Sequence, residues 1–154
     1  MSLPSAPGKF SPDLLKALHE IGLVQHFPEG SMLFQQGCAV TGVYVVESGE
    51  VRVLLRTGHT PMQLLEAAGP GTPLGLSESM NGEDYRVSAE AGDGTAAIFI
   101  PREEFLAFLR DHSEFHMQVV RLLSEDLHGL YQKFRSISAH PGRPRQRLLG
   151  EELN

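Results

Sequence analysis

The sequence predicts a mainly β protein with flanking helices, and three observations support this class. Short apolar runs alternate with turn residues from Leu23 to Ile100, which is typical of an antiparallel sandwich or barrel. An amphipathic segment precedes this region, and a heptad repeat of apolar residues follows it. We therefore expect an antiparallel double-stranded β-helix (jelly-roll) barrel, a short N-terminal helix and a long C-terminal dimerisation helix.

The N-terminal helix is expected to begin after Ser11 and to end at Gly22. Ser11 is a favourable N-cap, Pro12 suits the first helical position, and glycine commonly ends a helix. The apolar residues of this segment share one face, which we expect to dock on the sheet. They are Leu14, Leu15, Leu18 and Ile21.

The barrel is expected to consist of many short strands. The pattern predicts them at residues 31–35, 42–47, 50–56, 63–66, 86–91 and 96–100. Glycine-containing turns separate the strands, among them Gly69-Pro70-Gly71 and Asn81-Gly82. The clearest hairpin runs from Val43 to Leu54 and turns at Ser48-Gly49-Glu50.

Two helices are expected after the last strand. The first covers Pro101–Leu109 and carries Glu103 and Glu104 in its first turn, where the helix dipole favours acids. The second is longer and runs to about Ser136.

The longer helix has two apolar edges. Phe115, Val119 and Leu122 form one edge, which we expect to face the barrel. The other edge repeats in steps of four and three residues and predicts the seam of a homodimer. This seam consists of His116, Val120, Leu123, Leu127, Leu130, Phe134 and Ile137. The alternative, that the whole stripe is intramolecular core, remains open.

Length and composition favour a single domain. The chain has 154 residues, of which 41% are hydrophobic. We expect a flexible N-terminus at 1–10, one domain at 11–137 and a tail at 138–154 without a helix-turn-helix domain.

No apolar run approaches the roughly 20 residues of a membrane span, and the N-terminus lacks a secretory signal pattern. A single cysteine, Cys38, fits a reducing compartment, so we expect a cytoplasmic protein with no membrane partner.

The charge of the chain is unevenly distributed. Residues 1–134 carry 9 Lys and Arg against 17 Asp and Glu, a balance of −8, whereas residues 135–154 carry four Arg against two Glu, a balance of +2. An acidic domain argues against nucleic acid as the main partner, because DNA affinity depends on neutralising phosphates. We expect the basic tail to be a solvated terminus.

Metal and catalytic chemistry find little support in the sequence. His112 and His116 have a spacing that can chelate zinc on one helix face, but no third ligand is near in sequence and the chain has no His-x-His pair. Haem ligation by a histidine or by Cys38 has less support still, since Cys38 lies in a predicted turn. The neighbouring acids Glu83 and Asp84 suit a turn rather than acid–base chemistry, and no nucleophile motif is present. We therefore expect neither a metal site nor an enzyme.

Four motifs together resemble the cyclic-nucleotide-binding domain, and within that family the sensor half of catabolite-activator/FNR-type regulators. They are Phe27–Gly37, Val43–Val53, Gly69-Pro70-Gly71 and Ile100–Phe105. The resemblance covers about residues 12–137 and implies an eight-stranded roll that acts in signal transduction and transcription regulation. Such regulators continue into a helix-turn-helix domain that reads DNA. This chain stops about where that domain would begin, so we expect no direct DNA binding by it.

The resemblance also implies where a ligand would bind. In the family, a Gly-Glu pair opens a short helix and an Arg starts the next strand; the Glu accepts from the ribose hydroxyl and the Arg pairs with the phosphate. Gly75 matches the glycine, Leu76 stands at the Glu position, and a gap-free count places Tyr85 at the Arg position. Arg86 should then point away from the pocket, because successive strand residues face opposite sides, unless the register slips around Asn81-Gly82. The candidate ligand-binding residues are Gly75, Leu76, Ser77, Glu78, Ser79, Tyr85, Arg86, Val87 and Ser88.

These departures lower the expected affinity for a cyclic nucleotide. Loss of the charge-assisted bond to phosphate costs roughly 2–5 kcal/mol, and loss of the ribose acceptor about 1–3 kcal/mol. We expect a homodimeric ligand-sensing domain in which ordinary cyclic AMP binding is millimolar or weaker. No cofactor is fixed by the sequence; the candidates are a cyclic nucleotide or another small anion, held by backbone N–H groups after Gly75 and by the hydroxyls of Ser77 and Ser79. The alternative is a ligand-free structural or partner-binding module on the same scaffold.

Overall fold

The computed structural model describes residues 8–125. Its elements follow one another as strands flanked by helices, and residues 116–125 form a further helical stretch. In chain order they are α1 (Pro12–Ile21), β1 (Leu23–Phe27), β2 (Met32–Phe34), β3 (Gly42–Ser48), β4 (Val51–Leu55), β5 (Gln63–Ala68), β6 (Pro73–Leu74), α2 (Leu76–Asn81), β7 (Ser88–Ala91), β8 (Thr95–Pro101), α3 (Arg102–Asp111) and the 3-10 helix η1 (Ser113–Phe115).

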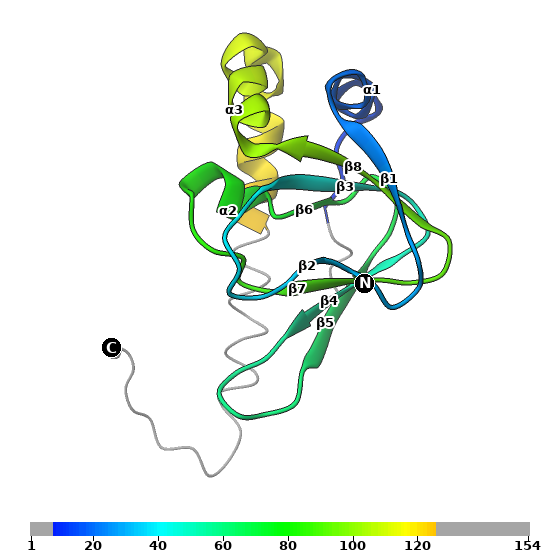
Figure 1. Cartoon of the computed structure of the whole chain (residues 1–154). Helices are drawn as coiled ribbons and strands as arrows, with labels where there is room; N and C mark the ends of the chain where they lie inside the picture. Colours follow the sequence, from blue (N-terminus) through cyan, green and yellow to red (C-terminus); the bar gives the residue numbers. More distant parts are fainter. Residues whose placement is uncertain (1–7, 126–154) are drawn as a thin grey trace, which may run out of the picture.

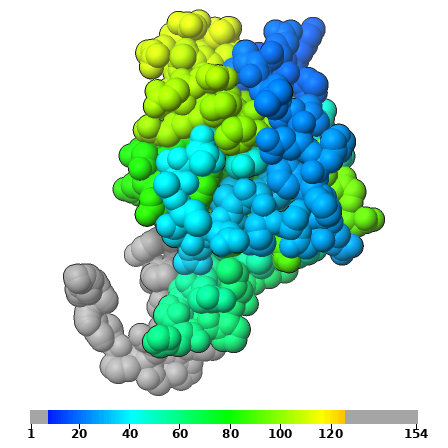
Figure 2. All heavy atoms as spheres, in the orientation of Figure 1, coloured from blue at the N-terminus to red at the C-terminus, as the bar shows by residue number. Residues whose placement is uncertain are grey.

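The strands form two four-stranded antiparallel sheets that lie one above the other (Figure 1). The first sheet has the order β1-β8-β3-β6 and the second the order β2-β7-β4-β5. Helices α1 and α3 lie on the same outer side of the first sheet (Figures 1 and 2). The predicted class, mainly β with flanking helices, is confirmed. The closed barrel is corrected to a sandwich, because no strand pair within residues 8–125 joins the two sheets.

The predicted Val43–Leu54 hairpin is wrong. β3 pairs with β6 and β8, whereas β4 pairs with β5 and β7, so the two strands belong to different sheets. Ser48-Gly49-Glu50 is therefore a corner at which the chain passes from one sheet to the other. This corner is bonded to the turn before β8: Ser48 Oγ donates to Gly94 O at 3.0 Å, and Thr95 Oγ1 donates to Glu50 O at 2.9 Å.

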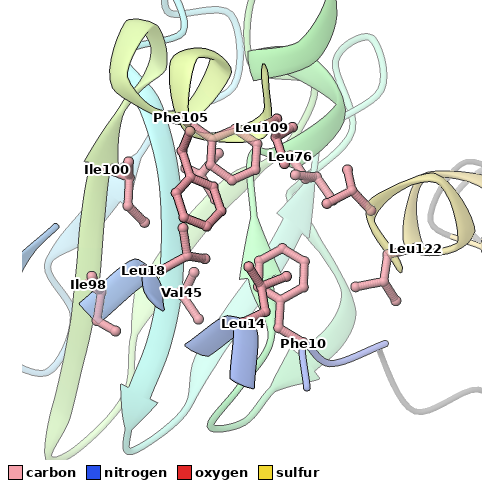
Figure 3. Packing of buried hydrophobic residues seen from close by; sticks show 13 residues of the cluster. Phe10, Leu14, Leu18, Val45, Leu76, Ile98, Ile100, Phe105, Leu109 and Leu122 are labelled. Carbon is pink, nitrogen blue, oxygen red and sulfur yellow. The ribbon is translucent and has the colours of Figure 1, made fainter. Parts of the chain in front are cut away.

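Two clusters of buried apolar side chains hold the helices and the two sheets together as layers. The first cluster lies between the first sheet and the helices and contains the fully buried Phe105 of α3 (Figure 3). The second cluster lies between the two sheets. β3 contributes to both, because Val43 and Val45 belong to the first cluster and Tyr44 and Val46 to the second. A strand buried on both faces shows no alternation of apolar and polar residues in its sequence.

Helix α1 begins and ends as predicted. Ser11 Oγ accepts a hydrogen bond from Leu14 N at 3.3 Å, and Gly22 N–H donates to Leu18 O. The sequence pattern missed two strands. β1 is an edge strand whose residues are exposed or half-buried, and β6 has only two residues, so neither shows a period of two.

The inner edge of the 116–125 helical stretch packs as predicted. Val119 and Leu122 are buried in the first cluster, and Phe115 packs against it. On the other side, Met117 and Val120 are 66% and 52% exposed. No helix among the described residues is both long and apolar enough to cross a membrane.

Only part of the predicted dimer seam is described. His116 and Val120 are exposed, and Leu123 is half-buried. The remaining seam residues lie outside the described part of the chain, so the dimer stays a prediction. They are Leu127, Leu130, Phe134 and Ile137.

Candidate functional site

The short helix α2 follows a glycine that the structure requires. Gly75 has φ +78°, and a Cβ at this position would lie 2.9 Å from Tyr85 Cε1 and 3.1 Å from Gly42 O. The helix has six residues and ends at Gly82, whose N–H donates to Glu78 O at 2.7 Å. The predicted glycine-started helical turn is thus confirmed. Its buried polar side chains belong to Ser77, Glu78 and Ser79.

Tyr85 is a buried link between the chain before β7 and the loop before β3. Its ring stacks on Phe34 with a centroid distance of 3.9 Å. Its hydroxyl accepts from Thr41 N at 3.1 Å and Gly42 N at 3.2 Å, and donates to Gly42 O at 2.9 Å. Burial, together with the neighbouring Tyr85, raises the pKa of Tyr44 above its ordinary value of 10.0.

Arg86 turns towards α2 and meets two of its side chains. The guanidinium donates to Ser77 Oγ, and its Nε lies 3.9 Å from Glu78 Oε2. The backbone N–H of Arg86 donates to the same carboxylate oxygen at 3.0 Å, and Ser77 Oγ donates to Glu78 Oε1 at 3.3 Å. The side chain of Glu78 is only 7% exposed and that of Arg86 is 35% exposed. Arg86 Nε is buried and has no hydrogen-bond partner among the described residues.

Of the two directions that the sequence left open for Arg86, the structure has the one towards α2. The opposite direction assumed that residues 85 and 86 already alternate as part of a strand, but β7 begins only at Ser88. Tyr85 belongs to the cluster between the sheets, whereas Arg86 contacts α2. The structure thus shows which protein groups surround Arg86. Whether Arg86 binds a ligand stays a prediction.

Other candidate residues belong to the core rather than to the group around Arg86. Leu76 is 3% exposed and lies in the first cluster with Leu109 and Leu122 (Figure 3). Val87 packs against the second cluster, and Ser88 Oγ accepts a backbone N–H from the loop after β2. The structure thus brings together Ser77, Glu78 and Arg86 out of the predicted set.

Arg102 is a residue near the site that the sequence did not single out. Its Nε donates to Ser79 O at 2.7 Å, and its backbone N–H donates to Thr41 O at 3.0 Å. The start of α3 is therefore bonded both to α2 and to the loop that Tyr85 holds. Ser79 Oγ itself is fully buried without a hydrogen-bond partner among the described residues. No local sequence signal indicates these pairings, because they join residues 23 and more positions apart.

A separate groove of about 580 Å³ lies between α1 and the end of β3. One ring nitrogen of His19 lies 3.0 Å from the Glu47 carboxylate at its rim. None of the lining residues belongs to α2 or β7, so this groove is distinct from the site around Arg86. They are Lys9, Phe10, Leu15, Lys16, His19, Glu20, Val46, Glu47, Pro70, Gly71 and Ile98.

The two histidines at zinc-like spacing each contact a backbone carbonyl. His112 Nδ1 lies 2.9 Å from Phe108 O, and His116 Nε2 contacts Leu109 O. One ring nitrogen of each residue is thus engaged. Within residues 8–125, no group of three or more His, Cys, Asp and Glu side chains is arranged to hold a metal ion.

The fold is a β-sandwich with helices on the outer side of its first sheet, and comparison with known proteins gives the family. Residues 24–112 match the cyclic nucleotide-binding domain. The chain belongs to this family, and its relatives are regulators of the Crp/Fnr type.

Two relatives each match part of this chain. The transcriptional activator protein anr of Pseudomonas aeruginosa is 30% identical over 99 residues, which cover 64% of this chain and 40% of the relative. The cyclic AMP receptor protein of Thermus thermophilus is 30% identical over 84 residues, which cover 54% of this chain and 39% of the relative. The chain therefore spans about two fifths of the length of the curated relatives that it matches.

Solved structures support the same fold. The catabolite activator protein of Thermus thermophilus superimposes with a TM-score of 0.72 at 23% identity, over 83% of this chain and 60% of that one. The sensor domain of the transcriptional regulator DNR from Pseudomonas aeruginosa gives a TM-score of 0.63 at 20% identity, over 79% of this chain and 82% of that one.

Replacing Tyr85 with phenylalanine is expected to lower the free energy of unfolding by about 1–3 kcal/mol. The change keeps the ring on Phe34 but leaves the N–H groups of Thr41 and Gly42 without their buried acceptor. Urea denaturation measures the loss. As a control, Ser31→Ala removes a hydroxyl whose bond to Pro28 O is exposed, so its effect should stay within about 0.5 kcal/mol. Equal losses in the two variants would contradict the role of the Tyr85 hydroxyl.

Proposed function

We infer that this chain is the sensing domain of a homodimeric transcription regulator, acts in the cytoplasm and has no enzymatic activity. Its ligand site lies between α2 and the residues before β7, and it does not hold cyclic nucleotides in the manner of its family. The observation that carries this proposal is the group around Arg86. The guanidinium already contacts Ser77 and Glu78, and Leu76 lies in the core instead of presenting an acceptor.

The site is connected to the elements that would transmit a signal. Leu76 follows Gly75 directly and lies in the same cluster as Leu122 of the 116–125 stretch (Figure 3). Arg102, at the start of α3, donates to the carbonyl of Ser79 within α2. A ligand that binds the two states of α2 with different affinity would therefore shift the helices on this side of the first sheet.

Calorimetry with cyclic AMP and cyclic GMP up to millimolar concentration tests the ligand part of the proposal. We expect no binding tighter than about 1 mM, since both specific contacts of the family are missing or engaged. Micromolar binding would mean that Arg86 leaves Glu78 for the phosphate, and the proposal of an altered site would then be wrong.

The dimer is expected to form through the exposed side of the helix that begins at residue 116. Exchanging Val120 for glutamate places two like charges in the predicted seam and should weaken the dimer at least tenfold, which corresponds to about 1.4 kcal/mol. Light scattering after size exclusion measures the change. Leu23→Glu adds the same charge at a residue of β1 that is 68% exposed, and it should leave the dimer intact. A wild-type protein that is monomeric at micromolar concentration would contradict the homodimer.

A ligand-free scaffold is the second candidate function. It is favoured by the packing of Tyr85 and Leu76, which both belong to apolar clusters. The domain would then serve only to position the C-terminal helix for a protein partner. A hydrogen-exchange comparison with and without a cellular small-molecule extract separates the two: protection at residues 75–88 supports a ligand, and unchanged exchange supports the scaffold.

A further inference from the structure

We propose that Glu78 acts as an internal anion that occupies the phosphate-binding groups of Arg86, so that the site excludes anionic ligands and favours an uncharged one. This inference rests on the proposed position of the ligand site between α2 and β7. It assigns to Glu78 the specificity of that site.

The contacts of Glu78 are those that a bound anion would make. Its Oε2 accepts the backbone N–H of Arg86 at 3.0 Å and lies 3.9 Å from the guanidinium Nε. Its Oε1 accepts from Ser77 Oγ at 3.3 Å, and the same hydroxyl oxygen accepts from the guanidinium. One carboxylate thus engages a backbone donor, a hydroxyl and a cation, which is the donor set that a phosphate group prefers.

Burial strengthens the electrostatic repulsion between this carboxylate and any other anion at the site. The side chain of Glu78 is 7% exposed, and charges in a poorly hydrated site interact far more strongly than charges in water. An incoming phosphate would have to approach this negative charge and share one guanidinium with it. Two like charges at such a distance disfavour each other, so binding of the second anion is costly.

The guanidinium remains partly accessible. The Arg86 side chain is 35% exposed although its Nε is buried, so a ligand would meet the terminal nitrogens of the group. An uncharged ligand with a carbonyl, amide or hydroxyl oxygen can accept from this group without repulsion from Glu78. The ligand class that fits is therefore a neutral, polar small molecule.

The test compares cyclic AMP with adenosine, its uncharged counterpart, by calorimetry of the whole chain. Glu78→Gln removes the charge and keeps an acceptor for the Arg86 N–H. We expect this variant to bind cyclic AMP at least tenfold more tightly than the wild type, while the affinity for adenosine changes less than threefold. Adding Arg86→Gln to the same chain should abolish the gain.

A matched control carries the same change in net charge. Glu29→Gln alters an exposed acid in the turn before β2, outside the proposed site, and should leave cyclic AMP affinity unchanged. If Glu78→Gln melts at a much lower temperature than the wild type, Glu78→Met removes the charge with similar volume and gives the same comparison.

The inference is overturned if folded Glu78 variants bind cyclic AMP no better than the wild type, or if Glu29→Gln gains as much as Glu78→Gln. Failure of the proposed function gives a different result. A monomeric wild type would contradict the homodimeric sensor and leave the comparison at Glu78 unaffected.

Discussion

Replacing Phe105 with alanine is expected to lower the free energy of unfolding by about 3–5 kcal/mol. Phe105 is fully buried at the centre of the first cluster, where α3 meets the sheet and α1 (Figure 3). Truncation removes the ring's apolar contacts and leaves a cavity whose walls belong to three different elements, so it cannot collapse easily. The melting temperature should fall by about 10 °C, as expected for a protein of this size.

The control for this substitution is Leu64→Ala. Leu64 lies on the edge strand β5 and is 59% exposed, so its truncation should change stability by less than about 0.5 kcal/mol. Circular dichroism with urea and heat measures both variants. A loss below 1 kcal/mol at Phe105 would mean that α3 does not anchor the helices to the first sheet.

The helices of this fold were predictable because their signals are local. Ser11, Pro12 and Gly22 mark the two ends of α1 by capping chemistry, and the structure has the same ends to within one residue. The inner edge at Val119 and Leu122 follows from helical periodicity alone. Neither inference needs knowledge of distant contacts.

The strand pairing was not predictable for the opposite reason. A hairpin and a corner between sheets have similar turn residues, and only the pairing partners distinguish them. β3 finds its partners in β8 and β6, which follow it by about 30 residues and more, and its residues Gly42–Val46 are buried on both faces. The sequence therefore showed where the chain turns but not which strand it meets next.

The local structure around the candidate site was predictable only in part. The glycine that opens α2 was recognised at Gly75, since such a position requires a positive φ. The direction of Arg86 could not be chosen from the sequence, because strand alternation does not apply to residues that precede β7. The contacts of Glu78 were hidden as well, since a carboxylate that accepts from a residue eight positions later leaves no pattern in the sequence.

Exchanging Gly49 for alanine is expected to cost about 2–5 kcal/mol of unfolding free energy, because two separate penalties add. Gly49 has φ +77°, a conformation that costs an L-residue roughly 1–2 kcal/mol. Its Cβ would also lie 2.7 Å from the backbone atoms of Gly94 and from Thr95 Cα. Backbone cannot move aside as a flexible side chain does, and such overpacking costs about 1–3 kcal/mol.

Gly30→Ala separates the two penalties. Gly30 has φ +88°, but nothing lies within 4 Å of a Cβ placed there, so only the conformational cost remains. Urea denaturation of both variants should give a loss at Gly49 that exceeds the loss at Gly30 by about 1–3 kcal/mol. Equal losses would mean that a Cβ at residue 49 meets no backbone, as in the open turn of a simple hairpin between β3 and β4. That result would contradict the corner between the sheets. A larger loss at Gly49 means that the corner between the sheets is closed by contact with the turn at Gly94, and that the sandwich depends on this close approach.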